Sequence, residues 1–106
     1  MTSLTYGTRR RLNRLFKERD RAEAARLLSE DCDADSMYLS TASESEVERC
    51  HFAALKLSHG NLESLVDAIT LAQTDFRDLL MAAGFGEDVH AHLNWLPGSE
   101  VRSPGI

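Results

Sequence analysis

Signals that start and stop helices follow one another closely from residue 43 onward, and this spacing constrains the fold more than any other feature. The run SESE at residues 43–46 has the pattern of a capping box, in which a serine and the glutamate three residues later satisfy each other's backbone N–H groups. Gly60-Asn61 is typical of a left-handed helix end followed at once by a new N-cap. Gly84 and Pro97 mark two further ends. The pattern predicts four successive helices with almost no connecting chain.

The apolar spacing divides the chain into six predicted helices, two of which precede residue 43. Their approximate bounds are 9–18, 20–30, 43–59, 61–73, 75–83 (with Thr74 as its N-cap) and 86–96. The first two could form one kinked helix, and the apolar pattern of the third predicts that it is the central, most buried one. No segment alternates polar and apolar residues as a strand would. We therefore expect an all-α, single-domain orthogonal bundle of five or six short helices over residues 9–97, with a frayed N-terminus (1–8) and a flexible C-terminal tail (98–106).

Length and composition indicate one soluble domain. A chain of 106 residues with 42% hydrophobic and 27% charged residues has ordinary globular composition and supports one core. No apolar run approaches the ~20 residues that a membrane-spanning helix needs. Cys32 and Cys50 are too few and too far apart for a disulfide framework, so both are predicted to be reduced thiols. We expect a cytoplasmic protein without membrane association.

The net charge of −5 conceals a strong asymmetry. Residues 1–27 carry eight basic and three acidic groups, whereas the rest of the chain carries four basic and fourteen acidic groups. In the first predicted helix and just beyond it, basic residues recur at helical spacing and form a candidate surface for an anionic partner: Arg10, Arg14, Lys17 and Arg21. The partner could be another protein or a second copy of the chain. Nucleic acid is less favoured, because no aromatic residues interleave the arginines and the acidic remainder would repel phosphates.

Two Glu-x-x-His patterns are the sharpest chemical signal, because residues three apart on a helix share a face and can bind one metal ion. They are Glu48–His51 and Glu87–His90. Carboxylate-bridged metal sites also need further glutamates on long helices, so a metal site at these residues is not the favoured interpretation. His90 and His92 are expected on the surface. No catalytic residue and no cofactor are predicted.

His51 falls inside the apolar arc of the third predicted helix. The favoured interpretation is a structural histidine, half-buried and hydrogen-bonded to a carboxylate or a carbonyl. The alternative is a titrating group in a pocket, with Glu48 beside it.

Three stretches resemble small bacterial helical proteins of unknown function: AEAARLLSEDC (22–32), ERCHFAALKLSHGNLESLVDAI (48–69) and TDFRDLLMAAGF (74–85). The resemblance covers roughly residues 20–96 and implies a compact, bacterial, cytoplasmic helical domain, with no catalytic residue to transfer. The leading hypothesis is a non-enzymatic protein-interaction module that could self-associate. The alternatives are a metal-binding protein or enzyme centred on His51 and Glu48, and a nucleic-acid-binding protein that uses the basic first helix.

Overall fold

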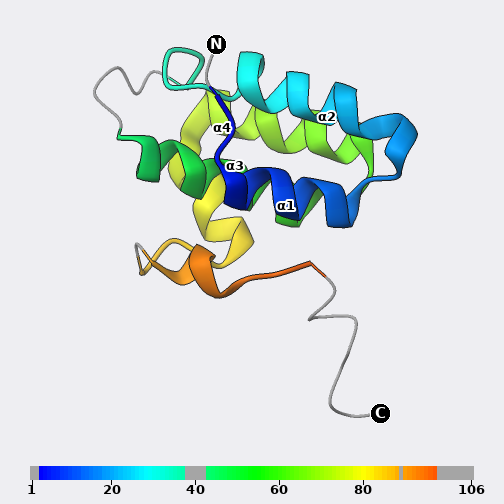
Figure 1. The fold of residues 1–106 in the computed structure, drawn as a ribbon. Helices are drawn as coiled ribbons and strands as arrows, with labels where there is room; N and C mark the ends of the chain where they lie inside the picture. Colours follow the sequence, from blue (N-terminus) through cyan, green and yellow to red (C-terminus); the bar gives the residue numbers. More distant parts are fainter. Residues whose placement is uncertain (1–2, 38–42, 89, 98–106) are drawn as a thin grey trace.

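The computed structural model describes residues 3–37, 43–88 and 90–97, which form a helical bundle (Figure 1). Its elements are α1 (Tyr6–Leu15), α2 (Glu18–Asp31), α3 (Glu44–Ser58), α4 (Leu62–Ala83) and the 3-10 helix η1 (Ala91–Asn94). The described residues contain no strand, so the all-α prediction is confirmed. None of their helices is long and apolar enough to cross a lipid bilayer. The expected five or six helices become four α-helices and one short 3-10 helix in the described ranges.

The fourth and fifth predicted helices form one kinked element, α4. Its backbone leaves helical geometry only at Asp75, where φ is −158° and ψ is 102°. The predicted N-cap was Thr74, but its hydroxyl donates to the carbonyl of Thr70 at 2.9 Å. The Asp75 carboxylate instead accepts the backbone N–H of Arg77 at 3.0 Å. Asp75 therefore caps the second half of α4 while the first half runs directly into it.

The last predicted helix, over residues 86–96, is largely wrong: only η1 forms in this segment, and Val89 lies outside the described residues. The Asp88 carboxylate accepts the backbone N–H of His90 at 2.8 Å and so makes a turn. Arg11 and Arg49 donate to backbone carbonyls of the segment. Carbonyls that bind arginines from other helices favour an irregular path over a regular helix.

The two N-terminal helices begin earlier than expected. Helix α1 starts at Tyr6 instead of Arg9, since Thr5 caps it by accepting the N–H of Thr8 at 3.2 Å. Leu4 lies in the core. Helix α2 starts at Glu18 instead of residue 20, and the two helices are separate. Residues 1–2 of the predicted frayed N-terminus and the whole predicted tail, 98–106, lie outside the described residues.

Helix α3 is the central helix, as its apolar pattern predicted. Eight of its fifteen residues are buried, and it packs against α1, α4 and η1. The predicted capping box is confirmed: Ser43 Oγ accepts the Glu46 N–H at 3.2 Å, and Ser43 N–H donates to Glu46 Oε1 at 3.3 Å.

The turn between α3 and α4 packs against the end of α1 and requires glycine. Gly60 has φ +79°, and a Cβ at this position would lie 2.4 Å from the Leu15 carbonyl oxygen. The Asn61 side chain then caps α4 by accepting the Ser64 N–H at 2.9 Å, as predicted. This turn fixes α1 beside the α3–α4 hairpin.

Candidate functional site

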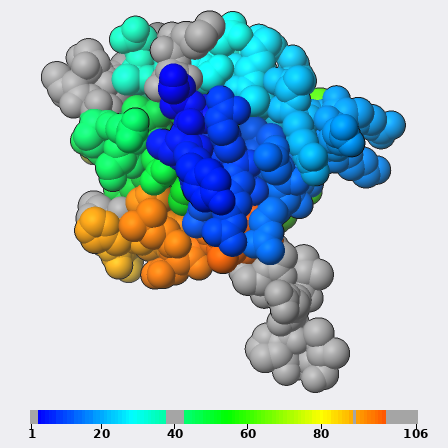
Figure 2. Space-filling model, in the orientation of Figure 1, coloured from blue at the N-terminus to red at the C-terminus, as the bar shows by residue number. Residues whose placement is uncertain are grey.

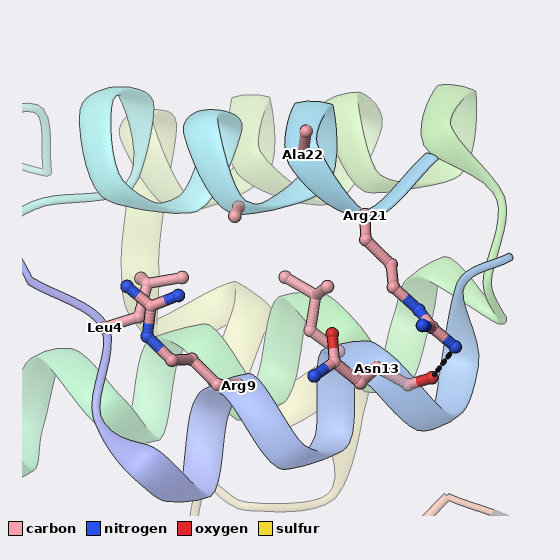
Figure 3. Close-up of a pocket in the computed structure, with 7 residues that line it drawn as sticks. Leu4, Arg9, Asn13, Arg21 and Ala22 are labelled. Carbon is pink, nitrogen blue, oxygen red and sulfur yellow. Dashed lines mark hydrogen bonds between the residues drawn. The ribbon is translucent and has the colours of Figure 1, made fainter. Parts of the chain in front are cut away.

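A groove runs between α1 and α2 on the basic side of the molecule. It consists of two overlapping depressions of about 210 and 400 Å³. They share four lining residues: Leu4, Arg9, Ala22 and Ala25. Figure 3 shows Leu4 and Arg9 at one end of the smaller depression and Asn13 and Arg21 at the other. We call these two depressions the α1–α2 groove.

The floor of the groove is apolar, and its rim carries three arginines and one carboxylate, that of Glu30. Leu4 and Leu12 are buried core residues that also line it. On α2, Ala22 is exposed and Ala25 half-buried, and these small side chains leave space between the helices. Arg9 is exposed, and its guanidinium forms no hydrogen bond or ion pair with another residue in the described ranges. The groove therefore offers an apolar surface with an uncompensated cation above it.

The two other arginines of the groove are held by the protein itself. Arg21 donates from Nη2 to the carbonyl of Asn13 at 2.9 Å, and from Nε to that of Phe16 at 3.1 Å, which ties the start of α2 to the end of α1 (Figure 3). Arg26 forms an ion pair with Glu23 at 2.6 Å and a longer one with Glu30 at 3.9 Å. Arg9 is thus the arginine of the rim that is open to a ligand.

The structure brings only one of the four predicted binding residues to the groove. Arg21 lines it, whereas Arg10 and Arg14 are exposed residues of α1 that do not. Lys17 lines a separate depression of about 480 Å³ with Arg19 and the α3–α4 turn. Successive helical residues point 100° apart, so Arg9 faces the groove while its neighbour Arg10 does not. The sequence signal for Arg9 was its spacing of three from Leu12 on the groove side.

A second polar cluster lies on the opposite side of α1, where α1, α3 and η1 meet. Arg11 is buried and donates to the carbonyls of Trp95 (2.9 Å), Gly7 (3.0 Å) and Leu93 (3.4 Å). Its guanidinium carbon also lies 4.0 Å from the centroid of the Phe52 ring. This one side chain joins the C-terminal segment to the bundle.

His92, which was predicted to lie on the surface, belongs to this cluster and is 1% exposed. Its ring packs edge-on against Phe52, with 5.1 Å between centroids, and lies near Phe85. The prediction was wrong because the segment after Gly84 folds back onto α3 and does not continue as a surface helix. In sequence, only the neighbouring Trp95 indicated burial here.

Burial lowers the pKa of His92 below its usual value, although the nearby Glu48 carboxylate favours the protonated ring. Glu48 Oε1 lies 3.8 Å from His92 Nε2, and Thr5 donates a short hydrogen bond to Oε2. Neither ring nitrogen of His92 has a hydrogen-bond partner within the described part of the chain. A substrate could not reach this ring unless η1 moved, so the geometry suits a structural contact better than acid–base chemistry.

The proposed metal-binding residues do not converge. His51 is buried, and its Nε2 lies 2.8 Å from the carbonyl oxygen of Cys32. Glu48 faces Thr5 and His92 instead, while Glu87 and His90 are exposed. No group of three or more histidine, cysteine, aspartate or glutamate residues in the described ranges is placed to hold a metal ion.

His51 has the environment of the predicted structural histidine, but it is more deeply buried than expected. Burial lowers its pKa, and hydrogen bonding to backbone carbonyls only partly offsets this effect. The ring is therefore neutral near neutral pH. Both cysteines are also buried, and burial raises the pKa of Cys50 to about 12, which makes it an inert thiol.

Two cations of α3, Arg49 and Lys56, bind the end of α4 and the residues that follow it. Lys56 donates to the carbonyl of Ala83 at 2.9 Å, and Arg49 forms a short hydrogen bond to that of Phe85. These carbonyls follow the last turn of α4, where a helix leaves acceptors unpaired. Arg49 and Lys56 therefore stabilise the fold and are not available to a ligand.

Comparison with known proteins adds no relative: no family model matches the chain, and neither a curated protein nor a solved structure is similar to it.

Proposed function

We propose that the protein is a non-enzymatic interaction module whose α1–α2 groove binds an acidic amphipathic helix of a protein partner. The observation that carries the proposal is the combination, in one groove, of an apolar floor with the unpaired cation Arg9. A helix laid into a groove presents apolar residues at i, i+3 and i+4 to the floor. Carboxylates beside those residues would reach the rim.

The charge distribution supports a partner that is acidic. Most residues that line the groove belong to the basic first 27 residues, so the field around it attracts negative charge. Charge complementarity mainly accelerates association and selects the partner, while burial of the apolar contacts supplies most of the binding free energy. The two requirements together specify an amphipathic acidic segment.

A protein helix fits the groove better than a nucleic acid does. Leu4, Leu12, Ala22 and Ala25 give the floor aliphatic character, and the lining includes no aromatic side chain on which a base could stack. Phosphates would use the rim and leave the floor uncovered. The acidic remainder of the chain would also repel a polyanion longer than the groove.

The test uses nuclear magnetic resonance of the labelled full-length chain. A synthetic amphipathic peptide of about 18 residues, with glutamates flanking a Val/Leu stripe, is titrated in and compared with a scrambled peptide of equal charge. We expect shifts at Leu4, Arg9, Leu12, Ala22 and Ala25 with the amphipathic peptide only. Arg9→Glu should weaken binding about tenfold or more, because a like charge then faces the carboxylates.

Two controls make the test decisive. Arg77→Glu introduces the same charge change at an exposed position of α4 outside the groove, and it should bind the peptide as the natural chain does. A single-stranded DNA oligonucleotide serves as the competing ligand. Equal shifts from both peptides, or stronger shifts from the DNA, would contradict the proposal.

A further inference from the structure

The surface of α4 carries a second patch whose chemistry is the reverse of that of the α1–α2 groove. Exposed residues follow one face of the helix at positions i, i+3, i+4 and i+7, which we call the α4 stripe: Glu63, Val66, Asp67 and Thr70. Val66 is 45% exposed, an unusual exposure for a branched apolar side chain. An apolar residue thus lies beside carboxylates on an accessible helix.

The stripe borders a depression of about 300 Å³ between α3 and α4. Its lining is mostly apolar: Leu57, Ala68 and Leu71, with Ser64 and Asp67. Asp67 forms no ion pair with another residue in the described ranges. Glu63, by contrast, borders the depression that Lys17 and Arg19 also line, so two cations of the same chain lie near it. Asp67 is therefore the principal unbalanced charge of the stripe.

The geometry points to a second copy of this chain as a partner of the groove, with the α4 stripe of one copy in the α1–α2 groove of the next. This inference rests on the proposed function, because the stripe places an exposed apolar side chain beside a carboxylate, the two chemistries that the groove would bind. Val66 would lie over the floor formed by Leu4, Leu12, Ala22 and Ala25, and Asp67 would face Arg9.

Two features of the molecule favour this occupant. The groove and the stripe share no residue and lie on different helices, so one chain can use both at once. Two stripes facing each other would bring like charges together, which disfavours symmetric pairing through α4. The contact is therefore between unlike surfaces, and such contacts build rings or open chains of molecules.

Complementation between two variants tests the inference on the full chain. Arg9→Glu disables the groove but keeps the stripe, and Asp67→Arg disables the stripe but keeps the groove. Sedimentation should show the natural chain growing beyond a dimer between about 10 μM and 1 mM. Each variant alone should associate at least about tenfold more weakly, because like charges then face each other. An equimolar mixture should again assemble beyond a dimer, because each mutated surface of one variant then meets an opposite charge on the other.

Matched controls exclude effects of net charge. Arg77→Glu and Asp78→Arg change the charge by the same amounts at exposed α4 positions outside both surfaces, and they should associate as the natural chain does. Circular dichroism of every variant verifies that it is folded. Assembly should also weaken as NaCl rises from about 0.05 to 0.5 M, because the paired charges are at the surface.

The outcomes separate the inference from the function on which it rests. A natural chain that stays monomeric, or a variant mixture that stays monomeric, overturns the second-copy partner. If the acidic peptide still binds the groove in that case, the proposed function survives with a different partner. If the natural chain assembles and Arg9→Glu assembles equally well, this contact is wrong, and the peptide titration alone decides whether the groove binds an acidic helix.

Discussion

Arg9 and Arg11 are two residues apart on α1, yet they lie in opposite environments. Arg9 is exposed above the α1–α2 groove, while Arg11 is buried and donates to three carbonyls where α1 meets η1. Helix α1 is thus a surface element between α2 on one side and the C-terminal segment on the other (Figure 2). Basic residues of this region thus have two different environments: one face of α1 holds the fold together, and the other is exposed at the groove.

The largest expected effect is the loss of Arg11. Arg11→Met keeps much of the aliphatic volume but leaves the carbonyls of Trp95, Gly7 and Leu93 without their donor. We expect the free energy of unfolding to fall by about 3 kcal/mol, because several hydrogen bonds from a charged group are lost at a buried site. Urea unfolding measures this change. If Arg11→Met were as stable as the natural chain, the division of α1 into two faces would be wrong.

His51 is the next most important polar contact. His51→Ala removes the partner of the Cys32 carbonyl and opens a cavity beside it, so we expect a loss of about 2 kcal/mol in thermal unfolding. His51→Gln should recover part of this loss if its amide reaches the same carbonyl. Unchanged stability together with loss of partner binding would make His51 a functional residue instead.

Acid should destabilise the buried side of the molecule through both buried histidines. Their pKa values are lowered in the folded protein, so the unfolded chain takes up more protons once the pH falls below the usual histidine value of about 6.5. Stability is therefore complete above that pH and decreases as the pH falls toward the folded-state pKa values. Each histidine contributes at most about 1.4 kcal/mol per pH unit.

Urea unfolding between about pH 8 and pH 5 measures this dependence. His92→Leu should have a shallower pH profile than the natural chain and similar stability at pH 8, because the ring nitrogens lose no hydrogen bond to another described residue. A profile as steep as that of the natural chain would assign the effect to His51 alone.

The smallest expected effect on stability is that of Arg9. Arg9→Ala should change the free energy of unfolding by no more than about 0.5 kcal/mol, since the side chain is exposed and unpaired. The same substitution should weaken peptide binding in the groove. The free energies of unfolding of Arg9→Ala and Arg11→Met together distinguish the exposed face of α1 from the buried one. A large loss of stability in Arg9→Ala would contradict this distinction.

Local signals predicted the helical class well because caps and glycine ends act within a few residues. The capping box at Ser43 and the N-cap at Asn61 depend only on neighbouring backbone groups, and both are found. Each of these two predictions concerned an interaction between residues that are neighbours in the sequence.

The errors arose where residues distant in sequence meet. The path of the chain after Gly84 determines the environments of His92, Arg11 and Arg49. A helical wheel describes one helix at a time and gives no information on that path. The groove depends on how α1 packs against α2, so spacing along one helix could not place Arg9 beside it. The prediction that Arg10, Arg14 and Lys17 bind a partner stays a prediction.

Arg11 binds the C-terminal segment through hydrogen bonds to backbone carbonyl groups, which every amino acid possesses. Side chains of that segment can therefore change without altering what Arg11 binds, provided that the backbone keeps its path. Leu93 is half exposed and free to vary in this sense. In a set of related chains, we expect the amino-acid sequence of this segment to vary while its backbone path is kept. The arginine that holds the path lies more than eighty residues away in the sequence.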